Sequence, residues 1–262
     1  MNETGTGPRA PGRASADGGW LRRFHEGRDT ATRLICLPHA GGSASFFFPL
    51  SAGLAPDVEV LAVQYPGRQD RRHEPCLDSV SALTDALTEE LRGRLDRPFA
   101  LLGHSMGASV AFETARRLEA AGSGPQALYV SGRRAPTLPH DKGIHLADDA
   151  TLVAHIGALS GTDARILDDP EVLELVLPAI RADYRAAETY RYVPGPPLSC
   201  PLFVLTGDQD SQVTPAQARG WASHTAGAHE LTVLSGGHFY LSSHWGRVAE
   251  LVRGRLVRSG AS

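Results

Sequence analysis

The sequence feature that most constrains the fold is an abrupt turn at residues 103–107, Gly-His-Ser-Met-Gly, between an apolar run and a helical pattern. Residues 99–102 are apolar enough for a buried strand, and residues 108–115 favour a helix. Glycine occupies positions 103 and 107, where a tight strand-to-helix turn has no space for a Cβ atom. Such a turn lifts the Ser105 hydroxyl clear of the sheet and leaves the Met106 N–H free at a helix N-terminus. The pattern predicts a nucleophile at Ser105 and an oxyanion donor at Met106.

Length and composition allow one large α/β core. The chain has 262 residues, of which 42% are hydrophobic and 21% charged, enough for a single catalytic domain. The formal net charge of -3 argues against a general nucleic-acid-binding protein. Three cysteines without metal-ligand spacing indicate neither a disulfide framework nor a zinc site. Because we find no apolar run of 18 residues and no signal-peptide pattern, we expect a cytoplasmic protein that does not span a membrane.

The alternation of apolar strands and helical segments predicts a mostly parallel sheet flanked by helices. Residues 1–19 are polar and rich in glycine, so we expect a disordered tail followed by one domain over residues 20–258. In a parallel sheet, catalytic groups gather at the carboxyl ends of the strands. The expected strands are residues 33–37, 58–63, 99–102, 127–130, 201–206 and 230–234.

Residues 135–197 interrupt this alternation, because they carry helical patterns but no convincing strand. Within them, Asp168 and Asp169 precede a proline that suits the first turn of a helix, and Pro178 predicts a kink or a restart. We interpret the segment as an inserted helical lid that excludes water and shapes an acyl pocket. The alternative is a helical embellishment that only adds core.

The loop after the first predicted parallel strand reads Pro38-His-Ala-Gly-Gly42. Two glycines directly after a strand permit close approach of the backbone to a ligand. The Ala40 N–H is therefore a candidate second oxyanion donor. An ordinary strand-to-helix turn would have the same spacing.

The candidate acid and base follow the last two predicted strands. Asp208 and Asp210 both come directly after the strand at 201–206, and spacing alone does not separate them. His238 follows the strand at 230–234 and gives the chain order Ser, Asp, His of the α/β-hydrolase fold. His244 is the alternative base, but it falls within the predicted closing helix.

Five arginines follow predicted strands on the side of the sheet that carries the site: Arg68, Arg71, Arg72, Arg133 and Arg134. If they form an exposed rim, they would attract an acidic partner over long range. Solvated loop charges without such a role are the alternative interpretation.

Several motifs together resemble the type II thioesterases of polyketide and nonribosomal peptide assembly lines. They span most of residues 20–258, and the phrases at 177–184 and 188–190 extend the resemblance into the inserted segment. The resemblance implies Ser105 as nucleophile, Asp210 rather than Asp208 as acid, and His238 as base, with Ala40 and Met106 as oxyanion donors. The core motifs are Pro38-His-Ala-Gly-Gly42, Tyr65-Pro-Gly-Arg68, Gly103-His-Ser-Met-Gly107, Gly207-Asp-Gln-Asp210 and Gly236-Gly-His238.

The resemblance also implies a reaction and a partner. The expected reaction is hydrolysis of an acyl thioester on the phosphopantetheine arm of an acyl carrier or peptidyl carrier protein, which removes aberrant groups. This acyl transfer requires no metal and no cofactor. Two other classes remain open: an esterase for free small esters, which would keep the triad, and a noncatalytic binding module with the same fold.

Overall fold

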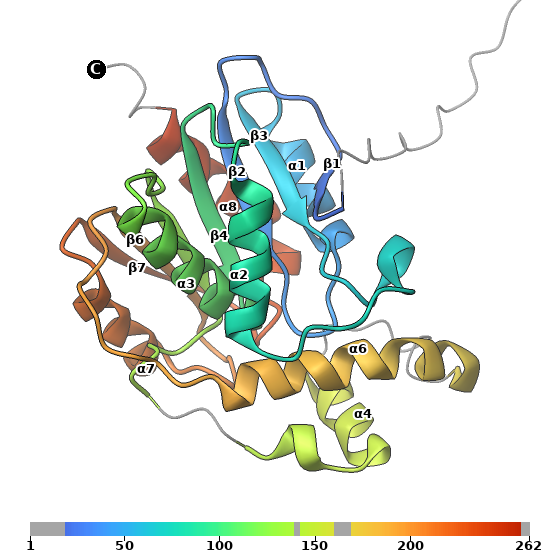
Figure 1. Cartoon of the computed structure of the whole chain (residues 1–262). Helices are drawn as coiled ribbons and strands as arrows, with labels where there is room; N and C mark the ends of the chain where they lie inside the picture. The colour runs from blue at the N-terminus through green and yellow to red at the C-terminus, as the bar shows by residue number, and fades with distance from the viewer. Residues whose placement is uncertain (1–18, 139–141, 160–168, 258–262) are drawn as a thin grey trace, which may run out of the picture.

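The computed structural model describes residues 19–138, 142–159 and 169–257. The predicted tail at residues 1–19 lies outside the described residues except for Gly19. Among the described residues, seven strands form one sheet in the order β1-β3-β2-β4-β5-β6-β7 (Figure 1). The strands are β1 (Leu21–Arg23), β2 (Thr32–Leu37), β3 (Val58–Val63), β4 (Phe99–His104), β5 (Leu128–Ser131), β6 (Leu202–Gly207) and β7 (His229–Leu234).

The sheet is parallel from β3 to β7, and the edge strand β1 alone runs antiparallel within it. The six predicted strands are confirmed, with ends that differ by one or two residues. The edge strand β1 was not predicted, because three residues are too few for an alternating pattern to be visible.

Helices cover both faces of the sheet. In Figure 1, α2 and α3 lie in front of the sheet, and α1 and α8 lie behind it. They pack pairwise, α2 against α3 and α1 against α8. Their bounds are α1 (Phe48–Leu54), α2 (Val80–Leu91), α3 (Met106–Ala120), α7 (Pro215–Arg219) and α8 (Leu241–Leu256). Ser79 caps α2, because its hydroxyl accepts the Ala82 N–H at 3.1 Å.

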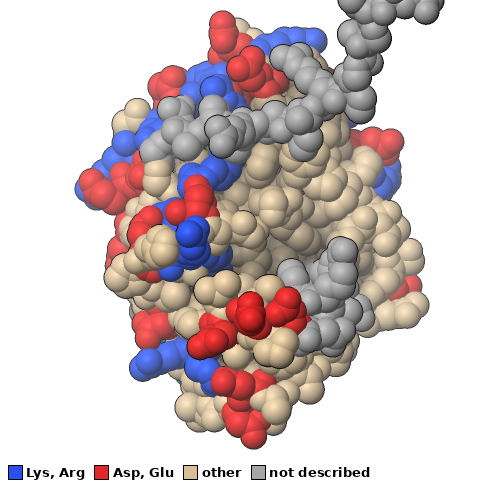
Figure 2. All heavy atoms as spheres, turned by 90° about the vertical axis from the view of Figure 1, so that its right-hand side faces the viewer, with Lys and Arg blue, Asp and Glu red and all other residues tan. Residues whose placement is uncertain are grey.

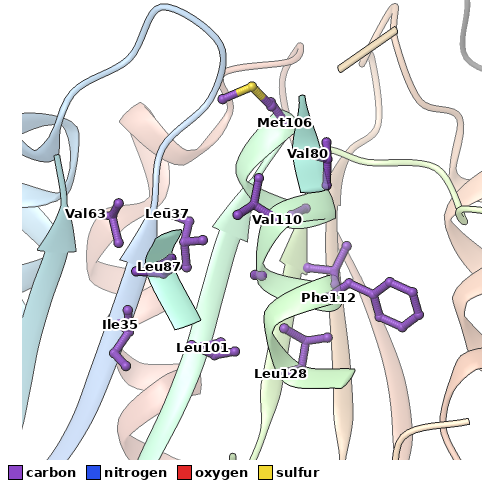
Figure 3. Close-up of a cluster of buried hydrophobic side chains, with 14 of the residues drawn as sticks. Ile35, Leu37, Val63, Val80, Leu87, Leu101, Met106, Val110, Phe112 and Leu128 are labelled. Carbon is purple, nitrogen blue, oxygen red and sulfur yellow. The ribbon is translucent and has the colours of Figure 1, made fainter. Parts of the chain in front are cut away.

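The alternation of side chains along each strand divides the core into two clusters. Ile35 and Leu101 point to the face covered by α2 and α3, where they pack with Val110 and Leu128 (Figure 3). Leu34 and its neighbours on other strands point to the opposite face, toward α1 and α8. Burial on both faces explains why the central strands read as continuous apolar runs rather than alternating ones.

Between β5 and β6 the chain forms α4 (Asp149–Ala158) and α6 (Pro170–Thr189), which we call the inserted helices. Within residues 132–138, 142–159 and 169–197, this segment contains no strand of the sheet. Asp169 caps α6, since its carboxylate accepts the N–H groups of Glu171 and Val172. The helix continues through Pro178 as one element, so the predicted restart does not occur. Both inserted helices lie below the sheet in Figure 1, at the carboxyl ends of its parallel strands.

Within the described residues, no helix is both long enough and apolar enough to cross a membrane.

Candidate active site

Ser105 lies in a strained turn between β4 and α3. Its backbone has φ 54° and ψ −116°, a conformation that L-residues rarely adopt. The turn is held by the Ser105 N–H, which donates to the Ser131 carbonyl of β5 at 2.8 Å. A Cβ atom on Gly103 would lie 2.2 Å from the Gly107 carbonyl oxygen, and one on Gly107 would lie 2.2 Å from that of Leu37. Glycine at both positions is therefore a steric requirement of this turn.

Ser105, His238 and Asp210 form a continuous chain of hydrogen bonds. The His238 Nε2 atom lies 3.0 Å from the Ser105 hydroxyl oxygen, and Nδ1 lies 2.9 and 3.1 Å from the two Asp210 carboxylate oxygens. His238 and Asp210 are both buried. The Asp210 carboxylate also accepts the N–H groups of Gln212 and Val213, which fix it in the loop after β6. This geometry allows a serine to transfer its proton to an imidazole that a carboxylate orients.

The alternative acid Asp208 and the alternative base His244 form hydrogen bonds with other residues than the three of this chain. The Asp208 carboxylate accepts the Gly236 N–H at 2.8 Å and so ties the loop after β6 to the loop after β7. The ring nitrogen Nε2 of His244 lies 2.8 Å from the Ser235 carbonyl on the exposed surface. The structure thus brings His238 and Asp210 to Ser105, while Asp208 and His244 connect loops.

The N–H groups of Ala40 and Met106 are available beside the serine. Met106 is the first residue of α3, where a helix leaves its N–H groups without an internal acceptor. Among the described residues, neither the Ala40 nor the Met106 N–H donates to a protein acceptor. Ala40 and Ser105 line the same cavity. Two unpaired donors near a serine suit a negative charge that develops on a carbonyl oxygen.

A set of buried side chains holds the loop that carries Ala40. The Tyr65 hydroxyl donates to the Pro38 carbonyl at 3.4 Å, and the Gln64 side-chain oxygen accepts the Ala44 N–H at 2.9 Å. Between these two contacts, the Asp183 carboxylate accepts the Gly41 N–H at 2.7 Å. The loop is thereby fixed from β3 on one side and from the inserted helix α6 on the other.

Asp183 also forms a buried ion pair with Arg68. Two guanidinium nitrogens of Arg68 lie 2.5 and 2.9 Å from the two carboxylate oxygens, and the Asp183 side chain is fully buried. Arg68 donates further to the Gly42 carbonyl at 3.2 Å. A buried bidentate pair with its remaining donors satisfied is directional and strong, so it fixes α6 relative to the loop.

The predicted arginine rim is wrong for three of its five members. Arg68 is buried against Asp183, and Arg71 is buried between Glu74, the Gln64 carbonyl and the Trp20 ring. Arg133 is buried and donates to the Ala187 carbonyl of α6. Arg72 is the exposed member. The sequence did not indicate this burial, because the partners that stabilise these arginines come mainly from distant parts of the chain.

Sequence reasoning also missed Asp183, although a signal was present. Ala179, Ile180 and Ala187 are buried positions of α6, and Asp183 lies between them on the same helix face. A carboxylate on the apolar face of a helix requires a buried partner.

The cavity beside Ser105 measures about 50 Å³ and extends beneath the inserted helices. Its walls combine apolar and polar groups, including Tyr184, Val213, Arg133 and Glu188. Figure 2 shows the face of the molecule on the right of Figure 1, where charged side chains surround a hollowed and largely uncharged centre. Among the described residues, no group of three or more His, Cys, Asp or Glu side chains could hold a metal ion.

Two buried histidines near the site, His39 and His104, have lowered pKa values and are therefore neutral at neutral pH. Burial, followed by the nearby His238 and Arg68, lowers the pKa of His39 to about 3. Burial also lowers the pKa of His104 well below its ordinary value. Both rings pack against Phe46 and Phe239, so the surroundings of His238 are aromatic and uncharged on this side.

A parallel sheet with a Gly-x-Ser-x-Gly turn after β4 and a Ser–His–Asp hydrogen-bond chain defines an α/β-hydrolase. A family model described as a thioesterase domain matches residues 32–256. The chain therefore belongs to the thioesterase family, among its type II members.

The similar proteins are thioesterases, two of them named as type II thioesterases of biosynthetic clusters or pathways. The thioesterase PikA5 of Streptomyces venezuelae is 52% identical over 244 residues, which cover 91% of this chain and 85% of PikA5. The structure of the type II thioesterase BorB, from the borrelidin biosynthetic cluster, superimposes with a TM-score of 0.86 at 51% identity and covers 90% of this chain and 97% of BorB. YbtT, a type II thioesterase of the yersiniabactin NRPS/PKS pathway, has a TM-score of 0.82 at 33% identity, covering 90% of this chain and 97% of YbtT.

Proposed function

We propose that this enzyme hydrolyses acyl thioesters on the phosphopantetheine arm of acyl or peptidyl carrier proteins, and so clears aberrant or stalled groups. The observation that carries the proposal is the Ser105–His238–Asp210 hydrogen-bond chain beside the free Ala40 and Met106 N–H groups. Membership of the thioesterase family and the similarity to BorB and YbtT support the substrate class. The carrier protein itself is inferred from these relatives.

In the proposed mechanism, His238 accepts the Ser105 proton while the serine oxygen attacks the thioester carbonyl. The Ala40 and Met106 N–H groups hold the oxyanion of the tetrahedral intermediate, whose collapse breaks the C–S bond. A thiolate is a good leaving group, so the demand on His238 as general acid is small. The departing thiolate takes the proton from His238, which becomes neutral again. His238 then accepts a proton from a water molecule that attacks the acyl-enzyme, and it returns this proton to the Ser105 oxygen as the free acid leaves. Asp210 orients the imidazole throughout.

We further propose that residues 20–258 act as one catalytic domain in which the inserted helices serve as the lid. The supporting contacts are those of Asp183 with Gly41 and Arg68, which attach α6 to the loop of Ala40. A lid attached at this point would exclude water from the acyl pocket and would stay in contact with the loop that carries the Ala40 N–H.

The test is deacylation of carrier proteins followed by intact-protein mass spectrometry. A carrier loaded with propanoyl-phosphopantetheine should lose the acyl mass in the presence of the enzyme, and Ser105→Ala should slow this loss by roughly three to six orders of magnitude. Ser109→Ala is a matched control, because Ser109 is a buried serine one helical turn further along α3. It should retain most of the activity.

Two results would contradict the proposal in different ways. Faster hydrolysis of a free propanoyl ester than of the loaded carrier would indicate an esterase. Failure of a fluorophosphonate probe to label Ser105 in the folded protein would indicate a noncatalytic binding module.

A further inference from the structure

Arg133 lies in the wall of the cavity that contains Ser105. It is the second residue after β5, whose last residue, Ser131, accepts the Ser105 N–H. Only 5% of Arg133 is exposed. A guanidinium group is thus buried beside the bond that the proposed reaction breaks.

The guanidinium makes few hydrogen bonds to the described residues. Its Nη2 atom donates to the Ala187 carbonyl at 2.9 Å, and this is its one hydrogen bond within residues 19–138, 142–159 and 169–257. Over the same residues, no carboxylate oxygen lies within 4.0 Å of it. Arg68 in the same part of the molecule is, in contrast, bound by both oxygens of Asp183. An arginine carries five N–H donors, so most of those on Arg133 have no acceptor among the described residues.

The unpaired donors of Arg133 are not enclosed by the protein. Those of its nitrogens that are fully enclosed have a hydrogen-bond partner, although the residue as a whole is buried. The nitrogens without a partner are therefore accessible from the two cavities that Arg133 lines, the one that contains Ser105 and a second one lined also by Arg134 and Tyr192.

Burial of this charge is compensated only in part. Ala187 lies in the last turn of α6, where carbonyl groups lack helical partners and the helix dipole favours a cation. Burial, and then the neighbouring Arg134, nevertheless lower the pKa of Arg133 to about 10, so that it remains a cation at neutral pH. A buried cation without a carboxylate partner is costly unless a ligand supplies an acceptor.

We propose that Arg133 binds an oxygen atom of the acyl group beyond the thioester carbonyl, such as a 3-oxo group, and thereby selects oxygenated acyl groups over saturated ones. This inference rests on the proposed function, because it places the acyl group in the cavity beside Ser105. The apolar side chains of Leu159 and Val213 in the same wall would contact the carbon chain, while Arg133 contacts the oxygen. Hydrogen bonds from a charged donor discriminate strongly against a ligand that lacks the acceptor.

The test compares two N-acetylcysteamine thioesters, butanoyl and 3-oxobutanoyl, which differ by one carbonyl oxygen. The kcat/KM ratio of the oxo substrate to the saturated one is measured for the wild type, Arg133→Met, Arg133→Lys and the exposed control Arg72→Met. Any difference in the intrinsic reactivity of the two thioesters cancels when the ratio of a variant is divided by that of the wild type. Removal of the charged donor in Arg133→Met should lower the ratio on the order of 10- to 100-fold.

The remaining variants separate recognition from a structural role. Arg133→Met also loses the hydrogen bond to the Ala187 carbonyl, so kcat/KM is expected to fall somewhat for both substrates. This structural effect acts on both substrates alike and does not lower the ratio. Arg133→Lys, which keeps the charge, should recover part of the ratio, and Arg72→Met should leave it at the wild-type value. An equal loss on both substrates, or no loss, overturns the inference.

Two further measurements keep the inference and the proposed function distinguishable. If the wild type hydrolyses neither thioester and deacylates no carrier, the proposed function fails. If both are hydrolysed but the ratio does not depend on Arg133, only the inference fails. If Arg133→Met does not fold, a measurement on the wild type takes its place: the inhibition constants of carba analogues of the two thioesters, in which CH2 replaces the thioester sulfur. Tighter binding of the oxo analogue supports the inference, and equal binding overturns it.

Discussion

The carboxylate of Asp183 accepts the Gly41 N–H at 2.7 Å, and so connects the inserted helix α6 to the residue that follows Ala40. The two segments also touch through Ile180, since a Cβ atom on Gly41 would lie 2.9 Å from Ile180 Cγ1. Gly41 itself has φ +76°. A displacement of α6 would therefore shift the loop, and with it the Ala40 N–H that we propose as an oxyanion donor.

The first prediction concerns this connection. Asp183→Asn should lower kcat about 10- to 100-fold with a small change in KM, because a displaced oxyanion donor weakens transition-state binding more than substrate binding. In Asp183 one oxygen, Oδ2, accepts both the Gly41 N–H and an Arg68 N–H, and Oδ1 accepts a second Arg68 N–H. The amide has no charge and sets an NH2 group in place of one of these oxygens, either against the Arg68 guanidinium or against the Gly41 N–H. Loss of the counter-ion of Arg68 should also destabilise the fold by about 3 to 5 kcal/mol. Steady-state kinetics and urea unfolding measure the two effects.

A control for Asp183 is an aspartate that pairs with the same helix from outside it. Asp78 pairs with Arg185 of α6, but both side chains are largely exposed, so Asp78→Asn should change stability by less than about 1 kcal/mol and leave kcat unaltered. The double variant Arg68→Met with Asp183→Leu removes both buried charges and should regain stability without regaining kcat, since Gly41 still lacks its acceptor. A full recovery of kcat in the double variant would contradict the positioning role.

The second prediction separates the two aspartates that spacing left equivalent. Asp210→Asn should lower kcat by roughly three to four orders of magnitude, because His238 is no longer held in the required tautomer. Asp208→Asn should cost much less, since an asparagine oxygen can still accept the Gly236 N–H. Kinetics on one carrier substrate decide between them, and the reverse ranking would assign the acid to Asp208.

The third prediction concerns stability in acid. The folded pKa of His39, about 3, is below the unfolded value of about 6.5, so the unfolded state binds a proton first as the pH falls. His39 therefore contributes stability that is present above pH 6.5 and is lost progressively toward pH 3. At pH 5 this loss should be about 2 kcal/mol.

Urea unfolding at pH 7.5 and pH 5.0 measures the loss. His39→Gln cannot be protonated there and should reduce the difference between the two pH values by about 2 kcal/mol. His73→Gln, at an exposed position, should show the wild-type difference. An unchanged difference in His39→Gln would show that His39 does not carry this linkage.

The fourth prediction compares two adjacent arginines. Arg71→Glu places a carboxylate beside Glu74 and removes the contact with Trp20, so it should destabilise the protein by about 2 to 3 kcal/mol. Arg72→Glu is an exposed change and should stay within about 0.5 kcal/mol. Thermal and urea unfolding of both variants test this difference. Equal stability of the two variants would argue that Arg71 is solvated, as the rim hypothesis required.

Local spacing was sufficient to predict the six parallel strands, the turn at Ser105 and the positions of His238 and Ala40, but not the short edge strand β1. Glycine at 103 and 107 and the order of short apolar runs depend on neighbours in sequence, and such patterns are visible in the sequence itself. The assignment of catalytic roles to these residues stays a prediction until the variants above are measured.

The contacts between distant residues could not be predicted in the same way. Arg68 and Asp183 are 115 positions apart in the sequence, and the sequence around either residue does not indicate that the other is its partner. Asp208 and Asp210 follow the same strand, and only the three-dimensional path of the loop after β7 decides that the first meets Gly236 and the second meets His238. Burial of Arg133 likewise depends on Ala187, 54 positions away, and burial of Arg71 depends in part on the distant Trp20.

The order of the strands in the chain has a consequence for biosynthesis. Ser105 and Ala40 follow central strands that a ribosome completes early, whereas Asp210 and His238 follow β6 and β7, the last two strands of the sheet. Domains acquire structure as they are translated, yet the Ser105 hydroxyl meets a base only after β7 has paired with β6. A nascent chain thus carries its reactive serine without the means to use it. Chains that end before residue 238 would lack the proposed base and, by the proposed mechanism, would not deacylate carrier proteins.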